Sequence, residues 1–288
     1  MTASVAPVAG VHIAAGTWRE DLRGVRVVWK RELLRFFRSR IRIVTSLAQP
    51  VLFLFILGTG LSPLVQGGEG SNFDFRTFMF PGVIAMTVLF TAIFSAVSIV
   101  WDREFGFLRE MLVAPVRRGA LVLGKCLGGA TVATLQGVIM LALAGLVHVP
   151  YAPLLLLTLV AEMALTAFAL TAFGVLLASR MQQVESFQVV MQFFVLPMFF
   201  LSGAVFPLSR LPGWLQVLTR LDPLTYAVDP MRRAVFAYVS PPASIQLVLD
   251  PGITWGGWRL PVLLEVAIVA VLGVLMLVTA VTQFSRAD

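Results

Sequence analysis

Residues 260–284 read LPVLLEVAIVAVLGVLMLVTAVTQF and hold a single charged side chain, that of Glu265. A helix of about 20 predominantly apolar residues crosses the hydrocarbon core of a bilayer, so this stretch predicts a transmembrane helix. Five further apolar runs precede it along the chain. Together they predict six spans, at about 43–61, 78–100, 121–147, 153–178, 187–207 and 260–283.

The composition supports the same fold class. The chain has 288 residues, of which 58% are hydrophobic and 13% are charged, and its mean hydropathy is +0.90. A soluble domain carries more charge, about 25% of its residues. We therefore expect an all-α membrane protein. A single cysteine, Cys126, excludes a disulfide framework and a cysteine zinc site, and two histidines, His12 and His148, leave little for a metal site or for acid–base chemistry.

The basic residues indicate the orientation of the spans. An even number of spans puts both termini on one side of the membrane. Segments on that side hold 15 of the 22 Lys and Arg residues, those on the other side hold six, and the remaining one, Lys125, lies at the end of a span. The positive-inside rule then predicts cytoplasmic N- and C-termini. Nine of these residues lie just before the first span, so we attribute the net charge of +7 to contacts with lipid headgroups and expect no nucleic-acid partner.

The segment before the first span has two parts. Residues 1–17 lack a charged region followed by an apolar one, so we expect a disordered lead without a cleavable signal peptide. In residues 18–41, apolar side chains recur at helical spacing among many basic ones. This pattern predicts an amphipathic helix in the plane of the headgroups, ahead of a six-span domain at 42–288; a soluble helix covering a domain is the alternative. The apolar positions are Leu22, Val25, Trp29, Leu33 and Phe36.

A polar segment at 208–240 separates the fifth and sixth runs. It contains two short helical pieces that are too brief and too charged to span; Asp222-Pro223 stops the first, and Asp229-Pro230 punctuates the second. Such pieces suit short re-entrant or interfacial helices that cap the extracellular mouth. The candidates for an extracellular gate are Trp214, Asp222 and Tyr226.

Residues 119–126, GALVLGKC, match the spacing of a phosphate loop, except that Cys126 replaces the Ser or Thr that holds Mg²⁺. A working loop lies between a strand and a helix, whereas a charged stretch broken by Pro115 precedes this match. We predict instead the start of the third span, with Lys125 reaching the headgroups. Without a nucleotide site or a nucleophile beside a base, we expect no catalysis by this chain alone, no catalytic residue, no metal and no bound cofactor.

The segment between the second and third spans has the features of a docking element. Its charges alternate in sign, and its aromatic side chains are anchors of the kind that dominate protein interfaces. It suits a groove on a soluble partner; a loop lying on the membrane is the alternative. The candidate docking residues are Asp102, Arg103, Glu104, Phe107, Arg109 and Glu110.

Two stretches resemble a known family of membrane proteins. Residues 101–130 read WDREFGFLREMLVAPVRRGALVLGKCLGGA, and residues 199–233 read FFLSGAVFPLSRLPGWLQVLTRLDPLTYAVDPMRR. Both are similar to the ABC-2 class of ATP-binding-cassette permeases, above all to the drug-resistance (daunorubicin type) and Nod-factor export permeases. The resemblance covers nearly the whole chain, with its elements in the same order.

The resemblance implies a half-transporter that lacks its own ATPase. Two permease copies, identical or close paralogues, would pair, and two separate ATP-binding-cassette ATPase subunits would bind ATP and Mg²⁺ below them. Residues 102–111 would lie at the coupling helix that contacts the ATPase, and residues 208–233 would form the external helices that close the exit. The absence of targeting signals fits a multi-pass protein of a bacterial inner membrane.

Charged and aromatic side chains within the spans are candidates for a substrate path. A charge inside a bilayer is costly, which singles out Glu162 and Glu265. Glu265 lies near the outer end, within reach of water, and Glu162 either takes part in transport or hydrogen-bonds Gln136 or a threonine. The resemblance places the fifth span near the two-fold axis, where its side chains either line a path or simply pack. The path candidates are Glu162, Gln192, Phe193, Met198 and Phe199.

These observations predict the permease subunit of an exporter for a hydrophobic or amphipathic substrate, such as a drug, a lipid or a glycoconjugate; export of an antibiotic would confer resistance. An ion-coupled secondary transporter is the alternative, and it predicts broken spans at equivalent positions of two repeats, which we do not find in this sequence. A third reading is an assembly component that transports nothing.

Overall fold

The computed structural model describes residues 18–65, 74–106, 117–208, 211–239, 252–255 and 257–286. Six helical segments in this part of the chain are long and apolar enough to cross a membrane, which confirms the predicted all-α membrane fold. The expected lead at 1–17 lies outside the described residues. The segments are Ile43–Pro63, Phe75–Glu104, Arg118–Leu141, Pro153–Ala178, Val184–Leu201 and Val262–Phe284.

Two of these segments are made of more than one helix. The first joins α2 (Arg40–Leu52), a π-helical turn η1 (Phe53–Leu57) and α3 (Gly58–Val65), and the second joins α4 (Phe75–Ser95) and α5 (Val97–Glu104). Pro50 lies inside α2, one turn before η1, and because proline removes an intrahelical hydrogen bond, it favours such a local change of pitch. The remaining spans are α7 (Arg118–Leu141), α8 (Pro153–Ala178), α9 (Val184–Leu201) and α13 (Val262–Arg286).

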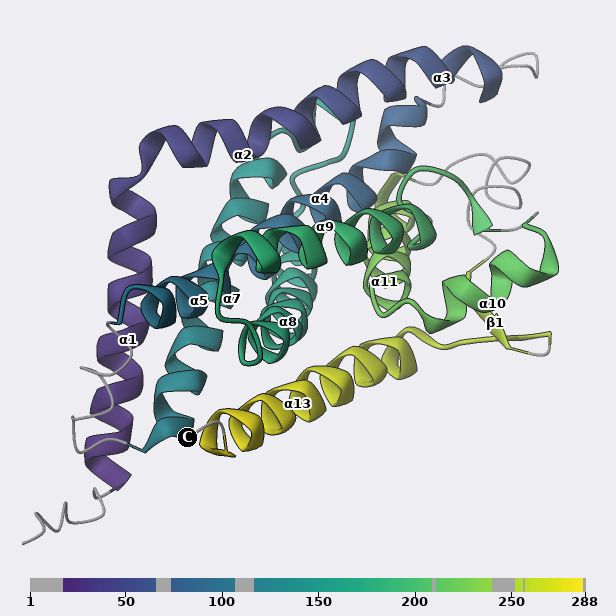
Figure 1. The fold of residues 1–288 in the computed structure, drawn as a ribbon. Coiled ribbons are helices and arrows are strands. Elements are labelled where there is room, and N and C mark those ends of the chain that lie inside the picture. The colour runs from purple at the N-terminus through teal and green to yellow at the C-terminus, as the bar shows by residue number, and fades with distance from the viewer. Residues whose placement is uncertain are drawn as a thin grey trace, which may run out of the picture.

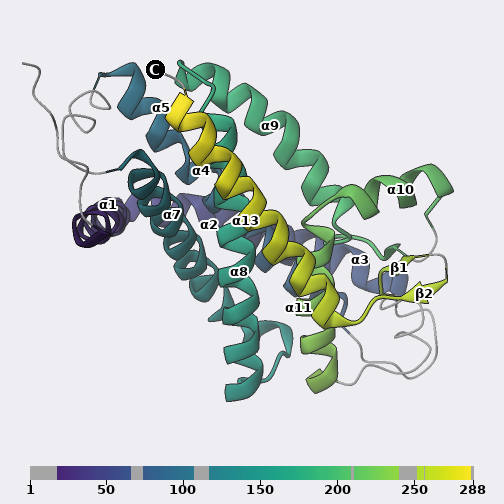
Figure 2. The same ribbon diagram turned by 90° about the horizontal axis from the view of Figure 1, so that it is seen from below.

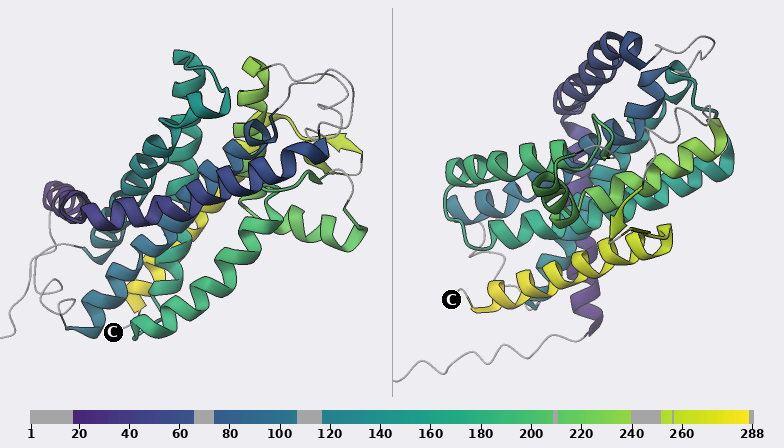
Figure 3. Two further views of the ribbon diagram at one scale, coloured as in Figure 1. Left: turned by 90° about the horizontal axis from the view of Figure 1, so that it is seen from above. Right: turned by 90° about the vertical axis from the view of Figure 1, so that its right-hand side faces the viewer.

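The helices form a bundle with α4 and α8 at its centre (Figures 1 and 2). Within its most apolar window the second span is 72% buried, whereas the first and sixth spans are each 17% buried. The first span lies along the outside of the bundle, as the view from above shows (Figure 3). Apolar side chains of the first and sixth spans are therefore left for lipid or a partner.

The bundle has two distinct ends (Figure 1). One end carries α1 (Trp18–Arg38), α5 and the C-terminus of α13; we name it the α1 end. The other carries α10 (Gly213–Leu221) and a hairpin of β1 (Thr254–Trp255) and β2 (Trp258–Arg259); we name it the α10 end. Helix α11 (Thr225–Val239) follows α10 and packs on α4, α8 and α13.

The ends of the third and fifth spans differ most from the prediction. The third span ends at Leu141, and residues 144–147 form a separate 3-10 turn, η2 (Ala144–Val147), that ends at His148 with φ 60°. The fifth ends at Leu201, and Gly203 follows with φ +73°. His148 and Gly203 both lie in the left-handed backbone region, where the chain changes direction. The hydropathy of a run of apolar residues does not predict such a turn.

Helix α1 packs closely against the bundle, whereas a helix that only lies in the headgroup plane needs no such contact. It packs along α7, where an added Cβ at Gly124 would lie 2.9 Å from the Cβ of Val28, and one at Gly128 would lie 2.8 Å from the Cβ of Glu32. Part of the predicted lipid-facing stripe, including Phe36, is buried, while Leu22 is 57% exposed. The helix ends at Arg38, and Ser39 separates it from α2.

The segment after the fifth span folds as two short helices. Asp222 follows the end of α10, as predicted from Asp222-Pro223. The expectation for Asp229-Pro230 was wrong, because Pro230 lies inside α11. It occupies the second turn of that helix, where tertiary packing tolerates one lost backbone bond: α11 is buried over most of residues 225–236.

Candidate functional site

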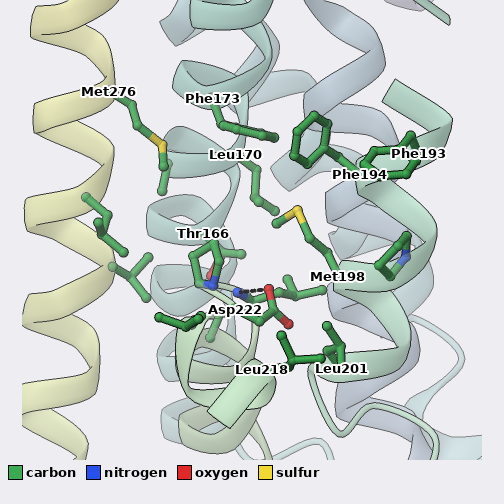
Figure 4. Close-up of a pocket in the computed structure, with 18 residues that line it drawn as sticks. Thr166, Leu170, Phe173, Phe193, Phe194, Met198, Leu201, Leu218, Asp222 and Met276 are labelled. Atoms are coloured by element: carbon green, nitrogen blue, oxygen red, sulfur yellow. Dashed lines mark hydrogen bonds between the residues drawn. The ribbon is translucent and has the colours of Figure 1, made fainter. Parts of the chain in front are cut away.

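A cavity of about 510 Å³ lies between α8, α9 and α13, and is closed at one end by α10 and the start of α11 (Figure 4). Met276 of α13 and Phe193 of α9 stand on opposite sides of it, with Leu170 and Phe173 of α8 between them. Such a volume is within the range of pockets that hold drug-sized ligands. The lining residues are Thr166, Ala169, Leu170, Phe173, Phe193, Phe194, Pro197, Met198, Leu201, Leu218, Leu221, Asp222, Pro223, Leu224, Ala227, Val269, Leu272 and Met276.

Helix α8 supplies one wall through a single face. Thr166, Ala169, Leu170 and Phe173 recur at spacings of three and four, which places them on one side of the helix. Phe173 contacts Phe194 of α9 edge to face, with ring centroids 5.6 Å apart. The wall is apolar except for the Thr166 hydroxyl, which donates to the Glu162 carbonyl at 2.7 Å.

The turn between α10 and α11 supplies the one ionisable group of this lining, Asp222. Its Oδ1 accepts the Leu224 N–H at 3.0 Å, and its Oδ2 accepts the Thr225 hydroxyl at 3.2 Å, so the carboxylate caps the start of α11. Burial raises the pKa of Asp222 to about 7, against the opposing effect of these two hydrogen bonds. Burial therefore favours the neutral form of this carboxyl group.

A second arrangement of interest is a buried ion-pair cluster at the α1 end. The Lys125 ammonium lies 2.6 Å from Asp102 Oδ2 and 2.9 Å from Glu32 Oε1, and it also donates to the Ser98 hydroxyl at 2.9 Å. Arg31 adds a contact of 2.9 Å to the same oxygen of Asp102. The cluster ties α1, the end of the second span and the start of the third together.

The sequence model of the ABC-2 type transporter family matches residues 23–236. The chain belongs to this family. It is 30% identical over 211 residues to Nodulation protein J of Rhizobium leguminosarum bv. viciae, covering 71% of this chain and 79% of the relative. The ycf38 transport permease of Cyanophora paradoxa is 28% identical over 209 residues, 72% of each protein. The Escherichia coli K12 protein named "Probable multidrug ABC transporter permease YbhR" is 31% identical over 168 residues, 58% of this chain and 45% of that protein.

The phosphate-loop match in this ABC-2 chain is part of a transmembrane helix. Residues 118–141 form the continuous helix α7, as predicted, so the match does not form a loop between a strand and a helix. The expectation for the Lys125 side chain was wrong: it is 8% exposed and engaged by Asp102 and Glu32 instead of reaching outward. Two carboxylates on neighbouring helices outcompete the headgroups for the ammonium.

The candidate docking residues of this ABC-2 chain divide into two groups. Asp102 is buried in the cluster, the Arg103 guanidinium donates to the Ser179 and Met181 carbonyls, and Glu104 accepts the Val184 N–H at 2.9 Å. The expectation of outward-facing charge was therefore wrong for Asp102, and the side chains of Arg103 and Glu104 hold α5 against the neighbouring spans. Phe107, Arg109 and Glu110 lie outside the described residues.

Only some of the candidates for a substrate path line the cavity. Phe193 and Met198 line the cavity. Phe199 turns away from it and contacts Phe53 of the first span edge to face at 5.9 Å, while Gln192 is exposed and does not line the cavity. Glu162 lies beside a separate small pocket next to the cavity. The predicted alternative was a hydrogen bond to Gln136 or a threonine. The Gln136 amide instead donates to the Ile43 carbonyl and the Ser46 hydroxyl, and the Thr166 hydroxyl donates to the backbone carbonyl of Glu162.

The three candidates for an extracellular gate lie in different environments. Asp222 lines the cavity, Tyr226 is buried beneath it with its hydroxyl donating to the Arg220 carbonyl at 2.7 Å, and Trp214 is 68% exposed on α10. The exposed face of α10 also carries Leu221. Its aromatic and aliphatic side chains suit an interfacial position at the membrane surface.

Glu265 has a structural environment that the sequence did not suggest. It was expected within reach of water, but its side chain is fully buried, and its Oε1 accepts from Arg233 of α11 at 3.0 Å. Arg233 also pairs with Asp229 at 2.5 Å and donates to the Leu260 carbonyl at 2.9 Å. A charge expected near the surface is instead part of the contact between α11 and α13.

Sequence reasoning missed most of the cavity wall. Leu170, Phe173 and Met276 were not candidates, although the spacing of Thr166, Leu170 and Phe173 is a usable helical signal. That signal is weak in α8 because the helix is apolar on all sides, so no polar face marks the opposite direction. The wall from α13 depends on which spans are neighbours, and this is a tertiary property.

Proposed function

We propose that this chain is the permease subunit of an ATP-driven exporter for hydrophobic or amphipathic molecules. The observation that carries the proposal is the apolar cavity, whose side chains come from three spans and from the helices at the α10 end. Phe193 and Leu221 at its margin are 73% and 74% exposed, so an apolar molecule enters from the surrounding lipid. Membership of the ABC-2 family supports the use of ATP by a partner.

In this proposal, ATP and Mg²⁺ bind to two separate ATP-binding-cassette ATPase subunits, and a second permease copy completes the membrane part. The termini are cytoplasmic and the α10 end faces outward, across a bacterial inner membrane. The exposed apolar faces of the first and sixth spans offer area for such pairing or for lipid.

The ATPase would contact the segment that follows α5. Trp101 and Phe105 form an edge-to-face pair with centroids 6.5 Å apart, and Phe105 is 66% exposed. These rings, together with Phe107, Arg109 and Glu110, are our docking residues. Asp102, Arg103 and Glu104 then act as positioning residues, because their contacts hold the base of this segment against the spans. Trp214, Asp222 and Tyr226 belong to the outer closure.

The test uses the full-length chain purified with its associated proteins from its native membrane. We expect an ATPase to co-purify, and we expect reconstituted vesicles to accumulate an apolar dye when ATP is added. Phe105→Asp should reduce ATP-dependent accumulation about tenfold and leave the chain folded, whereas Phe37→Asp, another exposed aromatic at the α1 end, should not. Accumulation driven by an ion gradient with ATP absent would overturn the proposal in favour of a secondary transporter.

A further inference from the structure

Glu162 continues the cavity-lining face of α8 by one helical turn. It lies four residues before Thr166, which lines the cavity, and Thr166 hydrogen-bonds the Glu162 carbonyl. Residues four apart in a helix stand one above the other. The Glu162 carboxyl group is therefore placed beside the end of the large cavity, although it is not part of its lining.

A small pocket lies between this carboxyl group and the cavity. It is lined by Glu162 and seven other residues, and three of these, Thr166, Ala227 and Val269, also line the large cavity. Its volume is about 10 Å³, close to the least space that one water-sized group needs. An ammonium group has about that size, so this pocket suits the head of a molecule whose body fills the cavity.

The Glu162 carboxyl group lacks a donor for one of its oxygens. Glu162 Oε2 is buried and has no hydrogen-bond partner among the described residues. A buried polar atom without a partner is costly, more so for a charged group. The residues that the structure places around the two pockets include two acids, Glu162 and Asp222, and no Lys, Arg or His. No cationic side chain of these linings therefore competes with a ligand for the Glu162 carboxyl group.

We propose that the substrate class of this cavity is a lipophilic amine, whose apolar body fills the space between α8, α9 and α13 and whose ammonium group donates to Glu162. This inference rests on the proposed function and specifies the cargo. Apolar side chains alone would accept any molecule of suitable size, but an unpartnered carboxyl group discriminates against one that brings no donor. Glu162 is then a specificity residue.

Binding of two matched probes tests the inference. Dansylcadaverine carries a dansyl ring, a five-carbon chain and a primary ammonium group; its N-acetyl derivative has the same ring and chain but no charge. The full-length chain in lipid nanodiscs is titrated with each, and dansyl fluorescence reports entry into an apolar site. We expect the amine to bind about tenfold more tightly than the acetylated probe.

Variants identify the groups responsible. Glu162→Gln should weaken binding of the amine about tenfold and leave the acetylated probe unchanged, while Glu185→Gln, an exposed acid on α9, should change neither. Phe194→Ala should weaken both probes, because it removes part of the cavity wall. Size-exclusion profiles and helical circular dichroism establish that each variant is folded.

The outcomes separate this inference from the proposed function. Equal binding of the two probes, or a preference for the amine that survives Glu162→Gln, would overturn the amine specificity while leaving the cavity as an apolar binding site. If neither probe binds, or if Phe194→Ala leaves both unchanged, the cavity itself fails as a binding site, and both proposals about it are wrong.

Discussion

The guanidinium carbon of Arg232 lies 4.2 Å from the centroid of the Phe78 ring, which joins α11 to α4 by a cation–π contact. Arg232 also donates to the Gly203 carbonyl, in the turn that follows the fifth span. The side chain is 3% exposed. One buried cation thus connects three parts of the α10 end that are distant in sequence.

Replacing Arg232 should loosen the α10 end. Arg232→Leu removes the cation–π contact and leaves the Gly203 carbonyl without this donor, so we expect a loss of about 2 kcal/mol in the free energy of unfolding. Thermal unfolding in detergent measures it. Arg26→Leu on the exposed side of α1 is the control, and an equal loss in both variants would contradict a specific role for Arg232.

Replacing Lys125 alone should lower the free energy of unfolding more than replacing it together with its partner Asp102. Lys125→Met leaves the Asp102 and Glu32 carboxylates buried without the ammonium, and breaking a buried pair costs about 3 kcal/mol or more. Lys125→Met with Asp102→Asn should recover part of the loss. A double variant that is less stable than the single one would show that the two side chains do not act as a pair.

The close packing of α1 on α7 predicts a steric effect. Gly128→Val places methyl groups where the Glu32 side chain lies and should push α1 away from α7. Cysteines substituted at Trp29 and Thr131, whose side chains are joined by a 3.0 Å hydrogen bond, should then cross-link less efficiently. The experiment needs a Cys126→Ala background. Gly60→Val, which meets open space, should leave the cross-link unchanged.

The raised pKa of Asp222 predicts a pH-dependent stability. Because the folded state holds this proton up to about pH 7, whereas an unfolded Asp releases it near pH 4, stability from this group is greatest below about pH 4 and falls as the pH rises to about 7. Asp222→Asn keeps an oxygen acceptor for the cap and should flatten the difference in melting temperature between pH 5 and pH 8. A difference unchanged in the variant would exclude Asp222 as its source.

The sequence by itself determined the class of fold. Length and apolar content alone predict each span, because a bilayer requires a helix of a certain length with its backbone bonds satisfied internally. The same reasoning predicted that the phosphate-loop match begins the third span, as α7 shows. The break at Asp222-Pro223 was also predictable, since it depends on local backbone chemistry.

Only the tertiary structure decided where the charged side chains go. Lys125 was expected to reach the headgroups and Glu265 to lie within reach of water, but both are buried in ion pairs whose partners lie 23 or more residues away along the chain. The cavity likewise needs α8, α9 and α13 to be neighbours. The hydropathy of a span that is apolar on all sides does not show which of its faces packs against another helix. The packing of these faces depends on their shape and on a few buried charges, which gain partners only when the helices meet.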